Sequence, residues 1–169
     1  MKKYVHQHCI SIKIFDKKPS FKYDVMYDDN GEMVVKKKKR SEWENHSTWL
    51  GQIKIGSYKR DFLMSCSIWN MEDYYRQWCE GLDRINLHSR SCLVMDVSYA
   101  RGLHSVEWWF LYKIGDNIHL KYAIWLGKTY DKMIGNLPFT PDTCYNFIPE
   151  RRTHEDDGEE IDELIVSCE

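Results

Sequence analysis

The sequence predicts an α+β fold: a single domain in which a mainly antiparallel β-sheet packs against one principal α-helix at about residues 70–85. Segments of strand composition lie on both sides of one amphipathic helical stretch, and a long alternating hairpin pattern follows it. The chain has 169 residues, of which 43% are hydrophobic and 14% aromatic, which is enough for one sizeable core. No internal repeat or domain boundary is evident, so we assign residues 1–169 to one domain.

Before the helix, four segments have strand composition, namely Tyr4–Phe15, Tyr23–Tyr27, Gly51–Gly56 and Tyr58–Trp69. The sequence DDNG at residues 28–31 is a turn signal, and it joins the second segment to Met33–Val35 as an N-terminal hairpin. Residues 36–49 are polar and charged, so we expect them to form a loose loop.

The helix is predicted from the stretch WNMEDYYRQWCEGLDRI, residues 69–85. Residues three and four apart share a helix face, and here they form one apolar stripe of Met71, Tyr74, Tyr75, Trp78, Leu82 and Ile85. Asn70 is a good N-cap, with Asp73 three residues later as in a capping box. We expect Trp78 to lie in the core and Gln77 to be solvated on the polar side.

After the helix, residues 91–99 read as a strand, and residues 106–126 form the clearest pattern of the chain. Alternation places Val106, Trp108, Phe110, Tyr112 and Ile114 on one face, with Ile118, Leu120, Tyr122, Ile124 and Leu126 across a turn at residues 115–117. The other face carries Trp109 and Trp125 among charged residues, and we expect both to be exposed or partly covered by a loop. Residues 161–167 form a short final strand.

Charge and cysteine content restrict the class of protein. The formal net charge is −2 and the sequence pI is near 6.4, so no global basic field attracts nucleic acid. No apolar run reaches the roughly 20 residues that span a bilayer, and the N-terminus lacks a signal-peptide core. The six cysteines contain no CxxC pair, which favours reduced thiols and a cytoplasmic location.

No constellation typical of catalysis or metal binding is present. The sequence HQHC at residues 6–9 has zinc-type ligands, but on a strand Cys9 faces away from His6 and His8, so we expect no metal and no cofactor. The chain lacks GxSxG, HExxH, Walker and GxGxxG motifs, which indicates that it is not an enzyme. A nuclease assembled from the dispersed histidines is a weak alternative, with His46, His88, His104 and His119 as its candidates.

Two charged runs are candidate interaction segments. Residues 155–163 hold seven acidic side chains in nine positions, which is either a solvated turn or a surface that meets a basic partner. The basic run Lys36–Arg40 is by default a solvated loop, and its alternative role is to bind phosphates.

Four pieces in this order resemble a known family: GQIKIG with YKRDF, then DYYRQWCEGLDRI, then EWWFLYKIGDNIHL, and last IPERRTHEDDGEEIDELIV. Together, from about Trp49 to the C-terminus, they resemble the bacterial immunity proteins of contact-dependent growth inhibition, the CdiI type. The resemblance implies a cytoplasmic protein that binds and neutralises the toxic C-terminal domain of a cognate CdiA-type effector. It also leads us to expect an RNase as the toxin, with tRNA as its substrate.

The resemblance assigns no contact residue, because immunity families diverge where they touch their partners. Charge and expected exposure therefore supply the candidate toxin-binding residues, which are Asp156, Asp157, Glu159, Glu160, Trp109 and Trp125. We expect no membrane partner and no direct nucleic-acid contact. The alternative hypothesis is a small nucleic-acid-binding module that uses Lys36–Arg40 and exposed aromatics.

Overall fold

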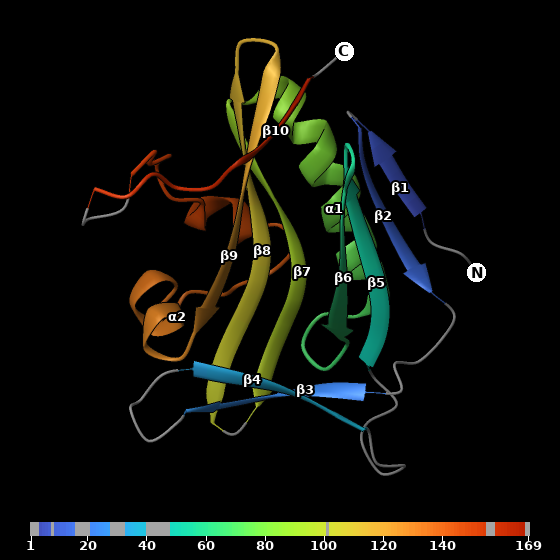
Figure 1. The fold of residues 1–169 in the computed structure, drawn as a ribbon, viewed down its shortest axis with the longest axis vertical. Coiled ribbons are helices and arrows are strands. Elements are labelled where there is room, and N and C mark those ends of the chain that lie inside the picture. The colour runs from blue at the N-terminus through green and yellow to red at the C-terminus, as the bar shows by residue number, and fades with distance from the viewer. Residues whose placement is uncertain are drawn as a thin grey trace.

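The computed structural model describes residues 4–7, 9–15, 21–27, 33–39, 48–100, 102–154 and 158–167 (Figure 1). One antiparallel sheet has the order β1-β2-β5-β6, with β1 at Tyr4–Gln7, β2 at Ile10–Phe15, β5 at Thr48–Ile55 and β6 at Tyr58–Ser65. A second has the order β10-β9-β8-β7, with β7 at Arg90–Ala100, β8 at Leu103–Ile114, β9 at Asn117–Leu126 and β10 at Leu164–Ser167. The helices are α1 (Met71–Leu87), α2 (Lys128–Met133) and the 3-10 turn η1 (Cys144–Phe147). The α+β class with one principal helix is confirmed, with its strands divided between two sheets.

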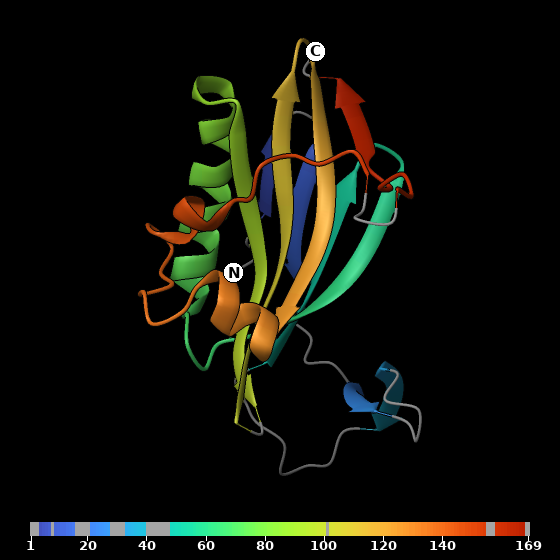
Figure 2. The same ribbon diagram turned by 90° about the vertical axis from the view of Figure 1, so that its left-hand side faces the viewer.

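The second sheet lies between two layers, as Figure 2 shows. On one face Tyr58 of β6 contacts Trp109, with ring centroids 5.8 Å apart. On the other face the chain after β9 crosses the sheet, and Phe139 lies 5.4 Å from Trp108. Because both faces are covered, the side chains of β8 are buried on both sides.

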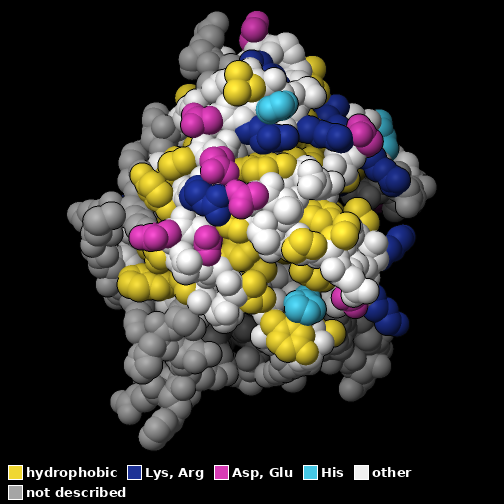
Figure 3. Space-filling view, turned by 180° about the vertical axis from the view of Figure 1, so that it is seen from behind, with side chains coloured by type: hydrophobic (Ala, Val, Ile, Leu, Met, Phe, Trp, Pro, Cys, Tyr) yellow, Lys and Arg dark blue, Asp and Glu magenta, His cyan; other side chains and the backbone are white. Residues whose placement is uncertain are grey.

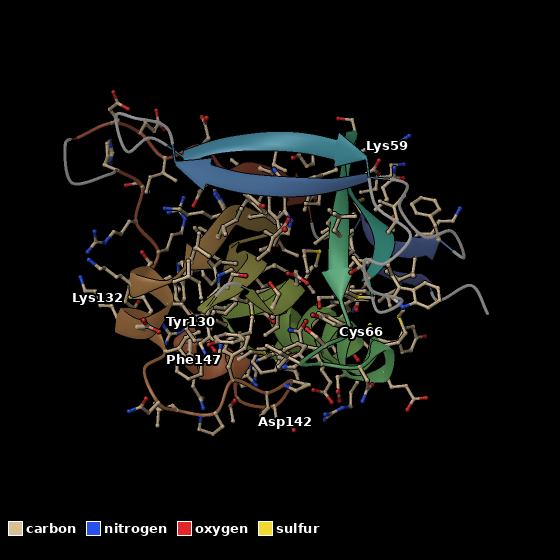
Figure 4. The ribbon with its side chains drawn as sticks, turned by 90° about the horizontal axis from the view of Figure 1, so that it is seen from below. Lys59, Cys66, Tyr130, Lys132, Asp142 and Phe147 are labelled. Atoms are coloured by element: carbon tan, nitrogen blue, oxygen red, sulfur yellow. The ribbon has the colours of Figure 1, made fainter. Side chains whose placement is uncertain are left out.

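The segment after β9 is held by aromatic contacts at the lower end of the molecule. Figure 4 places Tyr130 and Phe147 together on the α2 side, and both rings contact Phe139, at 6.4 and 5.7 Å. Trp69 stacks on Phe139 at 5.6 Å and donates its indole N–H to the Phe139 carbonyl, 3.1 Å away. This cluster attaches the segment to the start of α1.

The predicted faces of the hairpin are wrong for β9. The turn has two residues, Gly115 and Asp116, because Ile114 pairs directly with Asn117. Its register places Tyr122 opposite Trp109, whereas the predicted three-residue turn placed Tyr122 on the face of Trp108. A shift of one residue moves every side chain of a strand to the opposite face.

The N-terminal predictions need two corrections. Residues 4–15, predicted as one strand, form the hairpin of β1 and β2, in which Gln7 pairs with Ile10 and Cys9 has a φ of 58°. The turn contains no Gly, Asn or Asp, so no sequence signal marked it. The predicted loop at residues 36–49 overlaps a strand at each end. The strand that starts at Met33 continues through the lysines to Lys39, and the next strand begins at Thr48.

Two of the N-terminal strands form a separate two-stranded sheet. β3 (Phe21–Tyr27) and β4 (Met33–Lys39) pair antiparallel, as the predicted N-terminal hairpin requires. The predicted turn at residues 28–31 and residues 40–47 lie outside the described residues, and β5 begins at Thr48.

The start of α1 is capped as predicted. The Asn70 side-chain oxygen accepts hydrogen bonds from the backbone N–H groups of Glu72 and Asp73, at 2.8 and 3.0 Å. The Asp73 carboxylate in turn accepts from the Asn70 N–H at 3.0 Å, which completes the capping box. Trp78 is 1% exposed, so its predicted core position is confirmed.

Gln77, predicted to be solvated, is fully buried against the edge of β7. Its amide nitrogen donates to the Cys92 carbonyl and its amide oxygen accepts from the Val94 N–H, both at 2.9 Å. The side chain thus pairs with the edge of β7 as a neighbouring strand would. The prediction failed because an edge strand inside the molecule needs partners for its backbone groups, and helix periodicity does not reveal this need.

Two other residues of α1 also bond to this edge. The Trp78 indole donates to the Val94 carbonyl at 2.7 Å. The Tyr74 hydroxyl accepts from the Val97 N–H at 2.8 Å and donates to the Ser65 carbonyl of β6 at 2.9 Å. Tyr74 therefore connects the two sheets through the helix.

Gly81 permits this close approach of helix and strand. A Cβ atom at Gly81 would lie 2.4 Å from the Cys92 carbonyl oxygen, closer than any real contact. The Ser91 hydroxyl also donates to the Gly81 carbonyl at 2.6 Å. The helix cost of glycine, roughly 1 kcal/mol relative to alanine, is therefore offset by tertiary contact.

We predict that Gln77→Ala lowers the free energy of unfolding by about 2–4 kcal/mol, because the Cys92 carbonyl and the Val94 N–H would remain buried without partners. Trp78→Ala should cost about 3–5 kcal/mol, as large aromatic deletions do in packed cores. Urea denaturation followed by tryptophan fluorescence and circular dichroism measures both values.

The matched control is Gln52→Ala, which removes a surface hydrogen bond to Asp61 of 2.8 Å. Its effect should stay within about 0.5 kcal/mol. If Gln77→Ala were as mild as this control, the amide would not hold the edge of β7.

Candidate functional site

The acidic segment forms a loop whose two ends are joined. The Ile161 N–H donates to the Thr153 carbonyl at 2.9 Å, and His154 pairs with Glu160 in an antiparallel bridge. We call residues 154–160 the acidic loop. Glu159 and Glu160 are exposed.

The loop belongs to a C-terminal segment that crosses the second sheet and ends in β10 (Figure 2). Two of the candidate residues in it, Asp156 and Asp157, lie outside the described residues. Five of the seven acidic side chains of residues 155–163 fall within the acidic loop.

Glu163, the last acid of the run, is used inside the molecule. Arg151 donates to both of its carboxylate oxygens, from Nε at 3.1 Å and from Nη2 at 2.6 Å, and His119 Nδ1 lies 3.0 Å from Oε2. Burial raises the pKa of Glu163, but the hydrogen bonds from Arg151 and His119 outweigh this effect and hold the pKa below its ordinary value. This ion pair fixes the base of the acidic loop to β9.

Trp109 and Trp125, predicted as exposed candidates, are core residues with only 3% and 8% of their surface exposed. Trp109 lies between Tyr58 and Tyr122, with centroid distances of 5.8 and 5.2 Å. Trp125 packs edge-on against Trp108 at 4.5 Å. The predicted exposure was wrong because each face of the hairpin is covered by another layer.

A buried acidic pair between the two sheets has no signal in the sequence. Asp96 of β7 and Glu107 of β8 are register partners, and the Ser65 N–H of β6 donates to Asp96 Oδ1 at 2.6 Å. Burial raises the pKa of Asp96 to about 7, and burial also raises the pKa of Glu107, whose nearest cation is Arg60 at 4.0 Å. Asp96 thereby links β6 to β7, which are not hydrogen-bonded as strands.

A pocket of about 410 Å³ lies where α1 ends and β7 begins. Its lining is mostly polar and basic, with Arg84, His88, Ser89, Arg90, Tyr145, Asn146 and Ile148. The sequence signal for it was LDRINLHSR, which places three basic side chains within seven residues.

The three described candidate histidines, His88, His104 and His119, have different surroundings. His104 stacks between Tyr99 and Tyr130, at 4.5 and 5.1 Å, whereas His119 contacts Glu163 and His88 lines the pocket. His46 lies outside the described residues.

Within the described ranges, no group of three or more His, Cys, Asp or Glu side chains is placed to hold a metal ion. None of the helices in this part of the chain is long and apolar enough to cross a membrane.

Comparisons with known proteins agree on one family. The family model described as "CdiI N-terminal domain" matches residues 64–169. The protein "Immunity protein CdiI" of Enterobacter cloacae subsp. cloacae is 24% identical over 113 residues, which cover 66% of this chain and 73% of that protein. Among solved structures, the "CdiA-CT/CdiI toxin and immunity complex from Enterobacter cloacae" matches with a TM-score of 0.59 and 19% identity over 88% of each chain, which shows a shared fold.

We predict that Asp96 makes the protein less stable as the pH rises from about 4 to about 7. Its folded pKa is raised, so the folded state favours the protonated carboxyl, and that stabilisation is lost as the pH passes through the folded value. Three pH units correspond to at most about 4 kcal/mol. Asp96→Asn should remove most of this slope and make the variant more stable than the parent at pH 8, as measured by urea denaturation at several pH values.

The control is Asp61→Asn, which changes an exposed carboxylate of the neighbouring strand. It should keep the pH dependence of the parent. An Asp96→Asn variant with the full slope would assign the pH dependence to other groups, of which Glu107 is the first to test.

Proposed function

Because the chain belongs to the CdiI family of immunity proteins, we propose that it binds the C-terminal toxin domain of a cognate CdiA-type effector and neutralises it. The observation that carries this proposal is the family match over residues 64–169, which includes α1, the second sheet and the acidic loop. The structural neighbour from Enterobacter cloacae is a toxin and immunity complex, which supports direct binding of a toxin domain by this fold.

We propose that neutralisation is stoichiometric and that the protein catalyses no reaction. Two of the carboxyl groups with shifted pKa values, Asp96 and Glu163, support this, because their hydrogen bonds join parts of the fold to one another. Asp96 is held by a β6 backbone N–H, and Glu163 is held by Arg151. We also propose that the protein acts in the cytoplasm, which the free thiols of the five described cysteines support.

We propose that the acidic loop contacts the toxin. Its carboxylates suit a basic surface, such as an RNase uses to bind RNA, and an RNase is the toxin class that we propose. The Thr153–Ile161 hydrogen bond and the Arg151–Glu163 ion pair hold the loop base in place before binding. Less conformational freedom is therefore lost on association.

The alternative function, a nucleic-acid-binding module, loses its main support. That hypothesis required exposed aromatic rings on which bases could stack. Trp109 and Trp125 are buried and packed against other rings, so they offer no such platform.

We predict that co-expression of this protein with its cognate toxin domain restores growth of toxin-producing cells, whereas co-expression with an unrelated toxin does not. The purified protein alone should leave RNA intact, and mixing it with the toxin domain should yield a one-to-one complex by size-exclusion chromatography with light scattering. RNA cleavage by the protein alone, or protection without complex formation, would contradict the proposal.

We predict that replacing Asp156, Asp157, Glu159 and Glu160 by Asn or Gln slows association with the toxin several-fold at low salt. Exposed charges steer encounter over roughly a Debye length, which is about 10 Å at 0.1 M salt, so the difference should shrink near 0.5 M. Stopped-flow kinetics at two salt concentrations measures it.

A control variant neutralises four exposed carboxylates elsewhere, namely Glu72, Asp83, Asp116 and Asp131. It changes the net charge equally, so a smaller effect on association would locate the steering field at the loop. Equal effects of the two variants would remove the loop from the interface.

A further inference from the structure

The pocket beside the end of α1 is a distinct polar cavity of about 410 Å³. Three separate pieces of chain form its walls: the last turn of α1, the link into β7, and η1 with the residue that follows it. Figure 3 shows dark-blue Lys and Arg side chains gathered on the upper part of this face, at the end of the molecule where α1 ends. A volume of this size is typical of small-molecule sites.

The lining carries positive charge and no carboxylate. It contains two guanidinium groups, from Arg84 and Arg90, together with the imidazole of His88. Within the described part of the chain Arg84 forms no ion pair, while Arg90 pairs with Glu150 at 2.7 Å. The Glu150 side chain is 89% exposed, so a pair of this kind is weak and an anion can replace it.

The position of Arg84 is fixed before any ligand binds. Its guanidinium lies 4.7 Å from the ring centre of Tyr145, and the Tyr145 hydroxyl donates to the Gln77 carbonyl at 3.2 Å. Arg84 Nε is enclosed without a hydrogen-bond partner among the described residues. An unpaired buried donor destabilises the fold, and such local conflicts are typical of residues retained for binding.

We propose that this pocket binds a phosphate group, a function that goes beyond toxin neutralisation and does not depend on it. Guanidinium groups recognise oxyanions through paired N–H donors, and here they approach from two different elements, α1 and β7. Ser89 and Asn146 add neutral donors to the same lining. Phosphate offers more oxygens than a carboxylate and carries more charge at pH 7, so it satisfies donors that converge from several directions.

The helix dipole alone does not account for this arrangement. The C-terminus of α1 is electronegative and favours a basic residue such as Arg84 in its last turn. An arginine extended into solvent would already satisfy this preference of the helix C-terminus for positive charge. It does not explain a hollow in which Arg90, His88 and Asn146 join Arg84 from other elements.

The test follows the NMR chemical shifts of the ¹⁵N-labelled full-length protein during titration with inorganic phosphate and, separately, with ribose 5-phosphate. Sodium chloride and sodium acetate at equal ionic strength serve as reference salts, and isothermal titration calorimetry measures the same affinities. We expect saturable shifts at the backbone amides of residues 84–90 and 145–148. Arg84→Gln and Arg90→Gln should each weaken phosphate binding at least tenfold.

Arg76→Gln is the matched control, because Arg76 lies on α1 but outside the pocket lining. It should bind phosphate as the parent does, and circular dichroism checks that each variant is folded. If Arg84→Gln fails to fold, Asn146→Ala replaces it. Tighter binding of ribose 5-phosphate identifies a site for an esterified phosphate, tighter binding of inorganic phosphate identifies a site for the free ion, and equal affinity shows that the phosphate group alone is recognised. Non-saturable shifts, equal binding of acetate, or binding that survives both pocket arginine substitutions would overturn the proposal.

Discussion

The amide of Gln77 is the interaction on which the remaining architecture depends. It supplies a donor and an acceptor to the edge of β7 at the point where that sheet has no further strand. A helix normally covers the face of a sheet with apolar side chains, whereas α1 also replaces a strand along its edge. This pairing brings the helix so close to β7 that only glycine fits at position 81. It also brings the Tyr74 hydroxyl within hydrogen-bond distance of both sheets.

Once α1 occupies that edge, the two sheets can face each other without hydrogen bonding to one another as strands. β6 lies close to β7, where the Ser65 N–H donates to Asp96, and Tyr58 of β6 contacts the ring of Trp109 on β8. The second sheet is thereby covered on both faces, so the tryptophans of β8 and β9 are buried in the core. Charge on the surface is gathered in the acidic loop and, with opposite sign, in the basic pocket.

The features predicted correctly from the sequence are those decided by neighbouring residues. The Asn70–Asp73 capping box, the apolar stripe with Trp78 and the hairpin of β8 and β9 all follow from spacings of a few residues. The features missed are decided across the fold. The solvated position expected for Gln77 and the exposure expected for Trp109 would both hold for an isolated element, and each is reversed by a layer contributed by distant residues. The face of β9 depended on whether the turn had two residues or three, which alternation alone cannot decide. The acidic segment was visible as composition, but its attachment to β9 rests on Glu163 meeting a histidine 44 residues away.

Because the acidic loop is closed at its base, its sequence can change with little effect on the stability of the fold. Thr153 and Ile161 hold its ends together, and Arg151 and Glu163 secure those ends to His119 of β9, while Glu159 and Glu160 between them are exposed. Lengthening a closed loop costs only about 0.6 kcal/mol for each doubling, because the closure entropy grows with the logarithm of its length. Natural variation can therefore rewrite or extend residues 154–160 while the scaffold stays intact. Under the proposed contact between this loop and the toxin, small insertions at a single surface position would change specificity without a change of scaffold.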